Sequence, residues 1–165
     1  ESTGEITSDG ELLMEMGCKL LDKPYAITRG DSTLWVSRFI TGTEFYQQTG
    51  VDKDNDNSVK VVVTHYPRHE YHYAADRDTP GYDLVLAGHY HAGQYRIPFY
   101  GALFIPDVFT PAYLFPDQNE VKGLVTWGNT NQYVTAGLGA NCRIRLLQFR
   151  LFNTPEINVL TLTKK

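Results

Sequence analysis

Two runs of aliphatic residues, each followed almost at once by histidine, limit the folds that this chain can adopt. Residues 59–65 read V-K-V-V-V-T-H, and residues 84–91 read L-V-L-A-G-H-Y-H. Continuous aliphatic runs are typical of strands buried on both faces, as in a parallel sheet that helices cover. Ligands of open α/β sheets gather beyond the carboxyl ends of the strands. If the two strands are neighbours, we expect His65, His89 and His91 to converge at that edge.

The other segments predict a mixture of helix and strand around these two runs. Apolar residues at approximately helical spacing predict a helix over residues 11–21, which Pro24 would end. Residues 25–40 are typical of two strands joined by a Gly30-Asp31 turn. Three later segments also have the composition of strands: 124–139, 142–152 and 157–165. A parallel pair of strands together with a helix indicates the α/β class.

The composition is that of one ordinary globular domain. The chain has 165 residues, of which 42% are hydrophobic and 21% are charged, so it can build a core. Its net charge of −4 and its lack of a basic stripe argue against nucleic acid as the main partner. No apolar run approaches the roughly 20 residues that span a bilayer, and no signal peptide is recognisable. The location stays open between the cytoplasm and the membrane periphery.

Histidines in this arrangement are candidate metal ligands. Neutral imidazole is a good ligand for zinc, manganese and iron. The single residue between His89 and His91 lets the two rings point at separate ions or at two positions on one ion. Gly88 before them permits either an unusual backbone angle or a close approach of another segment. The alternative, still open at this point, is that each ring is an ordinary hydrogen-bonded surface histidine.

Four blocks of sequence resemble a known family when they are taken in order. V-V-V-T-H-Y-P, D-L-V-L-A-G-H-Y-H-A-G-Q, Y-V-T-A-G-L-G and N-T-P-E-I-N-V-L-T-L are similar to the C-terminal half of the calcineurin-like metallophosphoesterases. The second block resembles the G-H-T-H-G-G-Q motif of a single-domain bacterial branch, with Tyr90 in place of threonine and Ala92 in place of glycine. The resemblance covers approximately residues 10–165.

This resemblance implies a fold, a cofactor and a reaction. The fold is a four-layer αββα sandwich, of which residues 1–165 would form the C-terminal portion as a single domain. The family holds two divalent ions, commonly manganese, iron, zinc or magnesium, and hydrolyses phosphoric esters at the dinuclear centre. By analogy, His65 and His89 would bind the second ion and His91 would reach the first. No catalytic residue can be assigned by the same analogy.

The motifs of the family's N-terminal half are missing from this sequence. No D-x-H occurs, and the pair Gly30-Asp31 has Leu34 where G-D-x-x-D needs a second aspartate. The pair Gly128-Asn129 is followed by Thr130 and comes after His91, so it does not match G-N-H. We therefore expect the N-terminal half of the domain to be absent from this chain, the site to lack its carboxylates, and at most one ion to be held.

The function that follows is a metal-dependent phosphoesterase in the intact parent protein, with this chain alone incomplete and inactive. The alternative is a non-catalytic metal- or ligand-binding module that retains part of the site. A mononuclear zinc hydrolase is a third interpretation, but it needs a carboxylate base that the sequence does not identify. The phosphoester substrate stays unidentified. Exposed strand edges predict self-association or a need for the missing half.

Two further groups of residues are weaker candidates for substrate contacts. His69 and His72 lie in a polar segment that also holds Arg68, Glu70 and Arg77 and that could line a phosphate pocket, although a solvated loop is the more common outcome. Arg96, two residues beyond Gln94, could also contact substrate.

Overall fold

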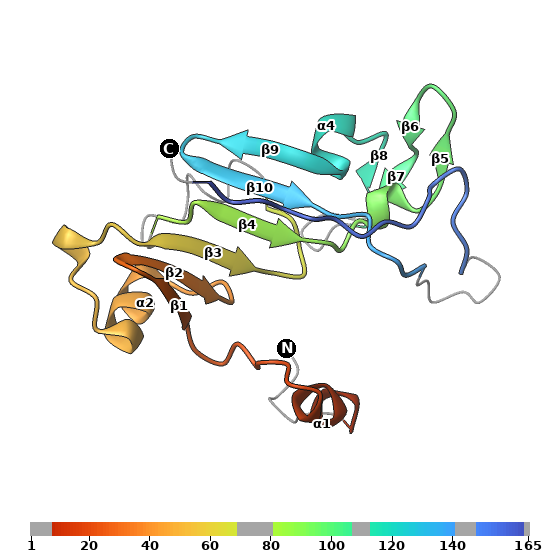
Figure 1. Ribbon diagram of the computed structural model, residues 1–165. Helices are drawn as coiled ribbons and strands as arrows, with labels where there is room; N and C mark the ends of the chain where they lie inside the picture. Colours follow the sequence, from red (N-terminus) through yellow and green to blue (C-terminus); the bar gives the residue numbers. More distant parts are fainter. Residues whose placement is uncertain (1–7, 69–80, 107–112, 141–147, 164–165) are drawn as a thin grey trace.

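The computed structural model of the protein describes residues 8–68, 81–106, 113–140 and 148–163. Its main feature is a six-stranded sheet (Figure 1), whose strands lie in the order β1 (Tyr25–Arg29), β2 (Ser32–Ser37), β3 (Val59–Val63), β4 (Leu84–Ala87), β10 (Thr130–Val134) and β9 (Gly123–Trp127). The four inner strands run parallel to one another, and the two edge strands run antiparallel to their neighbours.

The two aliphatic runs are neighbouring parallel strands at the centre of this sheet. Val61 lies opposite Leu84, and Val63 lies opposite Leu86. Val62 and Val85 are 0% exposed, as expected for strands in the middle of a covered sheet. The α/β class predicted from the sequence is therefore confirmed. The hairpin of β1 and β2 around Gly30-Asp31 is also confirmed, with Gly30 at a φ of 59°.

A short helix, α2 (Gly42–Thr49), covers one face of the sheet. The Thr41 hydroxyl caps its start by accepting a hydrogen bond from the Glu44 amide, and Gly50 ends it in the left-handed conformation. Its side chain Phe45 is fully buried and meets the Trp35 ring edge-on, with ring centroids 5.9 Å apart. On the same face, Val62 and Val85 pack with Phe39 and Tyr82.

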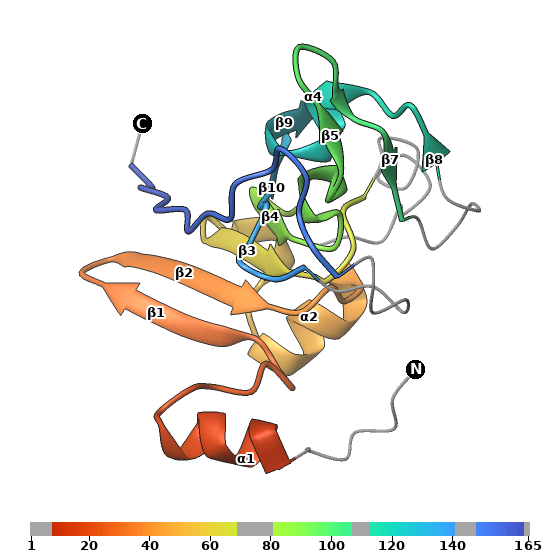
Figure 2. The ribbon, with the colours of Figure 1, turned by 90° about the vertical axis from the view of Figure 1, so that its right-hand side faces the viewer.

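The opposite face of the sheet is apolar and only partly covered. Ile27, Val59 and Val63 point to this side and are each more than 40% exposed. The C-terminal segment runs along this face, on the other side of the sheet from α2 (Figure 2). Its Asn158 and Leu160 help to line a cavity of about 310 Å³ over the carboxyl ends of β3 and β4. The second sheet of a four-layer sandwich is not among the described residues and stays a prediction.

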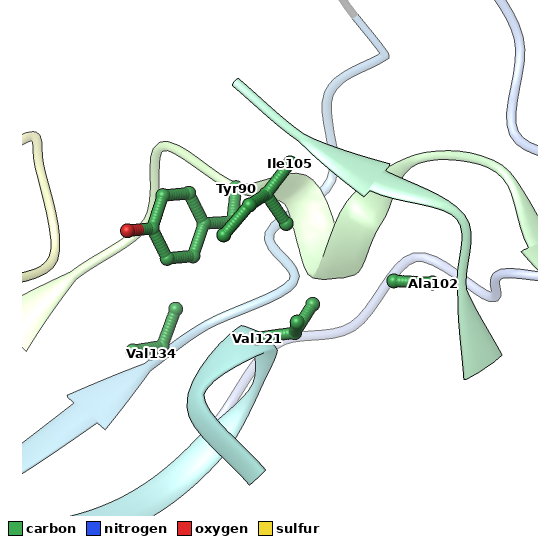
Figure 3. Packing of buried hydrophobic residues seen from close by; sticks show 5 residues of the cluster. All are labelled: Tyr90, Ala102, Ile105, Val121 and Val134. Atoms are coloured by element: carbon green, nitrogen blue, oxygen red, sulfur yellow. The ribbon is translucent and has the colours of Figure 1, made fainter. Parts of the chain in front are cut away.

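A second, smaller core lies beyond the carboxyl ends of the inner strands. It is built from short elements: η2 (His91–Gly93), β5 (Arg96–Ile97), β6 (Gly101–Ala102), β7 (Phe104–Ile105), β8 (Tyr113–Leu114) and α4 (Gln118–Val121). Buried residues from these elements and from β10 pack together, as Figure 3 shows for Tyr90, Ala102, Ile105, Val121 and Val134. This core supports the turn that follows β4 and carries His91.

The N-terminal helix differs from its prediction. The helix α1 spans Ser8–Glu15, so it ends well before residue 21 and before Pro24. Gly17 ends it, with a φ of 92° and a hydrogen bond from the Cys18 amide to the Leu13 carbonyl, because glycine adopts this left-handed conformation without steric cost. The apolar side chains that suggested the longer helix are exposed: Leu12 by 56% and Met16, just beyond the end of α1, by 74%.

The predicted C-terminal strands also differ from the structure. Residues 157–163 form no strand, because this segment lies over the sheet instead of pairing with its edge. Most of the strand predicted at 142–152 falls outside the described residues, and Leu151 makes a single bridge with Tyr95. A shorter helix, η1 (Lys53–Asn55), interrupts the polar loop before β3. Across the part of the chain described here, no helix combines the length and the apolar character needed to cross a membrane.

One ion pair close to the sheet, Lys60–Asp56, is buried, so its contribution to stability can be measured. Lys60 Nζ lies 2.7 Å from Asp56 Oδ2, and the two side chains are 7% and 2% exposed. Burial acts to raise the pKa of Asp56, but hydrogen bonds from Lys60 and Ser58 outweigh it and hold the pKa below its usual value. The exposed pair Arg38–Glu44, with side chains 54% and 34% exposed, offers a comparison in the same region.

We predict that Asp56→Asn lowers the free energy of unfolding by about 3 kcal/mol, because it leaves the Lys60 ammonium buried without its partner. Glu44→Gln, the control at the exposed pair, should cost about 1 kcal/mol or less. Urea unfolding followed by circular dichroism measures both. Because the folded pKa of Asp56 is lowered, its stabilising effect should be present above pH 4 and fade as the pH falls further. Equal losses in the two variants would contradict this prediction.

Candidate metal centre

The ladder between β3 and β4 continues past the ends of both strands and brings His65 and His89 together. The Thr64 amide donates to the Leu86 carbonyl at 2.9 Å, and the His89 amide donates to the His65 carbonyl at 2.9 Å. Gly88 has an ordinary φ, but a Cβ there would lie 3.1 Å from Thr135 Cγ2 on the next strand segment. Of the two explanations that the sequence left open for Gly88, the structure supports the close approach of another segment and not an unusual backbone angle.

The imidazole rings of His65 and His89 face each other at this edge. Nδ1 of His89 lies 2.7 Å from Nε2 of His65, which makes a hydrogen bond when one of the two nitrogens carries a proton. The ring of Tyr66 meets both imidazoles edge-on, with centroid distances of 4.6 Å to His65 and 4.4 Å to His89. The sequence predicted that three imidazoles meet at this edge, and the ring contacts bring two of them, His65 and His89, together.

His91 occupies a strained turn next to this pair. Four consecutive residues have positive φ angles: His91 (48°), Ala92 (54°), Gly93 (76°) and Gln94 (32°). This conformation costs a residue with a Cβ about 1–2 kcal/mol, and such strain is frequently found at functional sites. The ring is half-buried, and its Nδ1 atom has no hydrogen-bond partner among the described residues. A buried nitrogen without a partner is uncommon in folded proteins and calls for an explanation, of which an ion is one.

The surroundings of His91 favour its neutral form. Burial lowers the pKa of this imidazole, and the positive charge of Arg150 lowers it further. A backbone hydrogen bond at Gly139 acts in the opposite direction, and charge on His65 adds a smaller lowering. A neutral imidazole is the form that binds a metal ion.

The converging nitrogens fit one divalent ion after a small movement. Zinc–nitrogen bonds of 2.0–2.1 Å in tetrahedral geometry place two ligand nitrogens about 3.3 Å apart. His65 and His89 hold theirs at 2.7 Å, so the two nitrogens would have to separate by about 0.6 Å, and the rings turn toward a common point, to admit zinc. The described residues contain no group of three or more histidine, cysteine, aspartate or glutamate side chains placed to share an ion. Among the described residues, His91 is therefore not grouped with the pair in an arrangement that could hold an ion.

The turn around His91 is held by residues that the sequence analysis did not single out. The Arg150 guanidinium donates to the carbonyls of Ala136 at 2.5 Å and Gly139 at 2.6 Å. Asn153, which is 8% exposed, donates to the His91 carbonyl at 2.7 Å. The N-T-P-E-I block that contains Asn153 is a signal in the sequence, but the sequence does not show what that asparagine contacts.

The two arginines among the weaker candidates for substrate contacts, Arg68 and Arg96, contact other parts of the protein. Arg96 donates to the carbonyl of Ala92 at 2.8 Å, so its side chain braces the turn. The Arg68 guanidinium stacks 3.7 Å above the Phe39 ring, and its backbone amide donates to Gln132. The predicted contributions of His69, Glu70, His72 and Arg77 lie outside the described residues.

Two curated bacterial proteins are similar to this chain. The phosphodiesterase YaeI of Escherichia coli (strain K12) is 34% identical over 106 residues, which make up 64% of this chain and 33% of that protein. The uncharacterized metallophosphoesterase YkuE of Bacillus subtilis (strain 168) is 38% identical over 123 residues, which make up 73% of this chain and 36% of that protein. This chain belongs to the metallophosphoesterase family.

The family resemblance drawn from the sequence blocks is thus confirmed. The metallophosphoesterase chain described here spans about a third of the length of the curated relatives it matches. No model of a protein family matches the chain, and no solved structure matches it. The roles of His65, His89 and His91 as ligands stay predictions.

We predict that Gly93→Ala destabilises this metallophosphoesterase chain by about 3 kcal/mol. A Cβ at Gly93 would lie 2.2 Å from the Ala102 Cβ, and its φ of 76° strains any residue with a side chain. Gly128→Ala is the control, since Gly128 has a φ of 58° but open space around it, and it should cost only about 1 kcal/mol. Thermal unfolding compares the two, and equal shifts in Tm would show that the packing against Ala102 does not matter.

Proposed function

We propose that this chain forms part of a metal-dependent phosphoesterase and supplies histidine ligands to its metal centre. The observation that carries the proposal is the pair of ring nitrogens 2.7 Å apart at the ends of β3 and β4. Membership of the metallophosphoesterase family supports divalent ions as the cofactors. In the complete centre, His65 and His89 bind one ion and His91 binds the other; manganese, iron, zinc and magnesium are the candidates.

The metal centre supplies two effects when it is loaded: it lowers the pKa of a bound water and it stabilises charge on the phosphoryl group. The residues of this chain bind and orient. The β3–β4 ladder fixes the spacing of His65 and His89, and Tyr66 limits the tilt of both rings through its edge contacts. Burial, followed by the positive charge of Arg150, lowers the pKa of His91, which favours the neutral ring that can accept an ion.

The remaining ligands come from outside residues 1–165. The sequence contains no D-x-H, G-D-x-x-D or G-N-H motif, and it spans about a third of its relatives' length. We therefore propose that residues 1–165 form the C-terminal part of a four-layer αββα domain. The apolar sheet face that exposes Ile27, Val59 and Val63 suits packing against the other half of that domain, or against a second copy of this chain in its absence.

The substrate is a phosphoester. The name of the relative YaeI, a phosphodiesterase, makes a diester the first class to test. A non-catalytic metal-binding module is the second candidate function. The observation that favours it is that no carboxylate joins the histidines in a ligand group among the described residues.

We predict that the 165-residue chain, which lacks the other ligands of the complete centre, binds one equivalent of zinc through all three imidazoles and that His65→Ala or His89→Ala abolishes this binding. Each variant removes one of the two converging nitrogens. Tyr66→Phe is the matched control, because it keeps the ring contacts with both imidazoles and should retain the ion. Equilibrium dialysis with metal analysis measures the stoichiometry. Zinc binding that survives both histidine variants would contradict this placement of the ion.

We predict further that this chain with added manganese does not hydrolyse bis(4-nitrophenyl) phosphate, whereas the longer protein that contains it does. His89→Ala in the longer protein should lower kcat by at least about 100-fold, since an ion that stabilises the transition state loses a ligand. Release of nitrophenolate gives the rate. A longer protein that binds metal but shows no turnover of mono- or diesters would favour the binding module instead.

A further inference from the structure

The turn of residues 91–94 needs support from outside itself. Its left-handed residues include three with a Cβ, namely His91, Ala92 and Gln94. Within the turn, the Gln94 amide donates to the His91 carbonyl at 3.1 Å and the Gly93 amide donates to the Tyr90 carbonyl at 2.6 Å. The His91 amide adds a third local hydrogen bond, to the Gly88 carbonyl at 3.3 Å. These local bonds do not outweigh the strain of three such residues, so contacts with distant residues must stabilise this conformation.

Those contacts come from the segment 150–153. The side-chain amide of Asn153 donates to the carbonyl of His91 at 2.7 Å and lies 3.4 Å from the carbonyl of Gln94. It therefore bridges both ends of the strained turn. The backbone of Leu151 adds two hydrogen bonds, one from its amide to Gln94 at 3.2 Å and one to its carbonyl from Arg96 at 2.9 Å.

The chemistry at position 153 is specific to an amide. Both atoms that it faces are carbonyl oxygens, so the side chain must offer N–H groups and carry no negative charge. Asn153 is 8% exposed, which makes an unmatched polar group at this position costly. The His91 carbonyl that it binds belongs to the same residue whose imidazole is proposed above as a metal ligand.

We propose that Asn153 is a positioning residue for His91. By bridging the carbonyls of His91 and Gln94, it fixes the left-handed turn and with it the direction in which the imidazole presents its nitrogen. This proposal rests on the proposed function, in which His91 is a metal ligand. Supporting residues of this kind typically change metal affinity by 10–100-fold when they are removed.

The test is a double-mutant cycle on zinc affinity, measured by calorimetry in the 165-residue chain with zinc alone. Asn153→Asp keeps the shape of the side chain but replaces its N–H donors with an acceptor. We expect it to raise the Kd for zinc about 10-fold. In a His91→Ala background the same substitution should change the Kd less than 2-fold, because the residue through which Asn153 acts is gone.

Asn131→Asp is the matched control. Asn131 also directs its amide at a backbone carbonyl, that of Asp83, but at the opposite end of β4 and β10. Its substitution should leave the Kd for zinc unchanged. Asn153→Ala, which avoids burying a carboxylate, is measured alongside Asn153→Asp, and the Tm of every variant is recorded.

The outcomes separate this inference from the proposed function. If His91→Ala alone leaves the Kd unchanged, the assignment of His91 as a ligand fails. If His91→Ala weakens binding but both Asn153 variants bind normally, Asn153 is not a positioning residue and the assignment of His91 stands. The proposal would also be overturned if the Asn153 variants lost the same zinc affinity with and without the His91 imidazole, or if both variants unfolded. In either case Asn153 would act on the whole fold.

Discussion

The parallel register of β3 and β4 is the constraint on which the rest of this structure depends. Val61 and Val63 lie opposite Leu84 and Leu86, and the same ladder continues until the His89 amide reaches the His65 carbonyl. A shift of one residue would turn every side chain to the other face of the sheet. The aliphatic side chains that bury the two strands therefore also set the position of the two imidazoles at their ends.

The third histidine is positioned in a different way. His91 does not lie on the ladder but in a left-handed turn that local hydrogen bonds alone do not stabilise. Arg96, Arg150 and Asn153 supply the missing donors to the carbonyls around it. Of the three proposed ligands, two are thus positioned by regular sheet pairing, and the third lies in a strained turn that contacts with distant residues stabilise.

The sequence predicted those features that burial and local conformation determine. The aliphatic runs and the Gly30-Asp31 turn identified the central strands and the first hairpin. The predicted extent of the first helix was wrong, because Gly17 ends α1. The apolar side chains that suggested a longer helix are exposed. Residues 157–163 have the alternating pattern of a strand, but this pattern also suits an extended segment lying across a sheet face. The contact between Asn153 and His91 joins residues 62 positions apart, and one sequence alone does not reveal such pairs.

The central claim is that His65, His89 and His91 share a metal centre. Long-range proton–nitrogen NMR of the imidazole rings during a zinc titration of this chain tests it most directly, because all five histidines report at once and His69 and His72 serve as internal references. The account predicts that the ring nitrogens of His65, His89 and His91 shift together and saturate at one equivalent. Shifts confined to His69 and His72, or no saturable shift in any of the three, would contradict it.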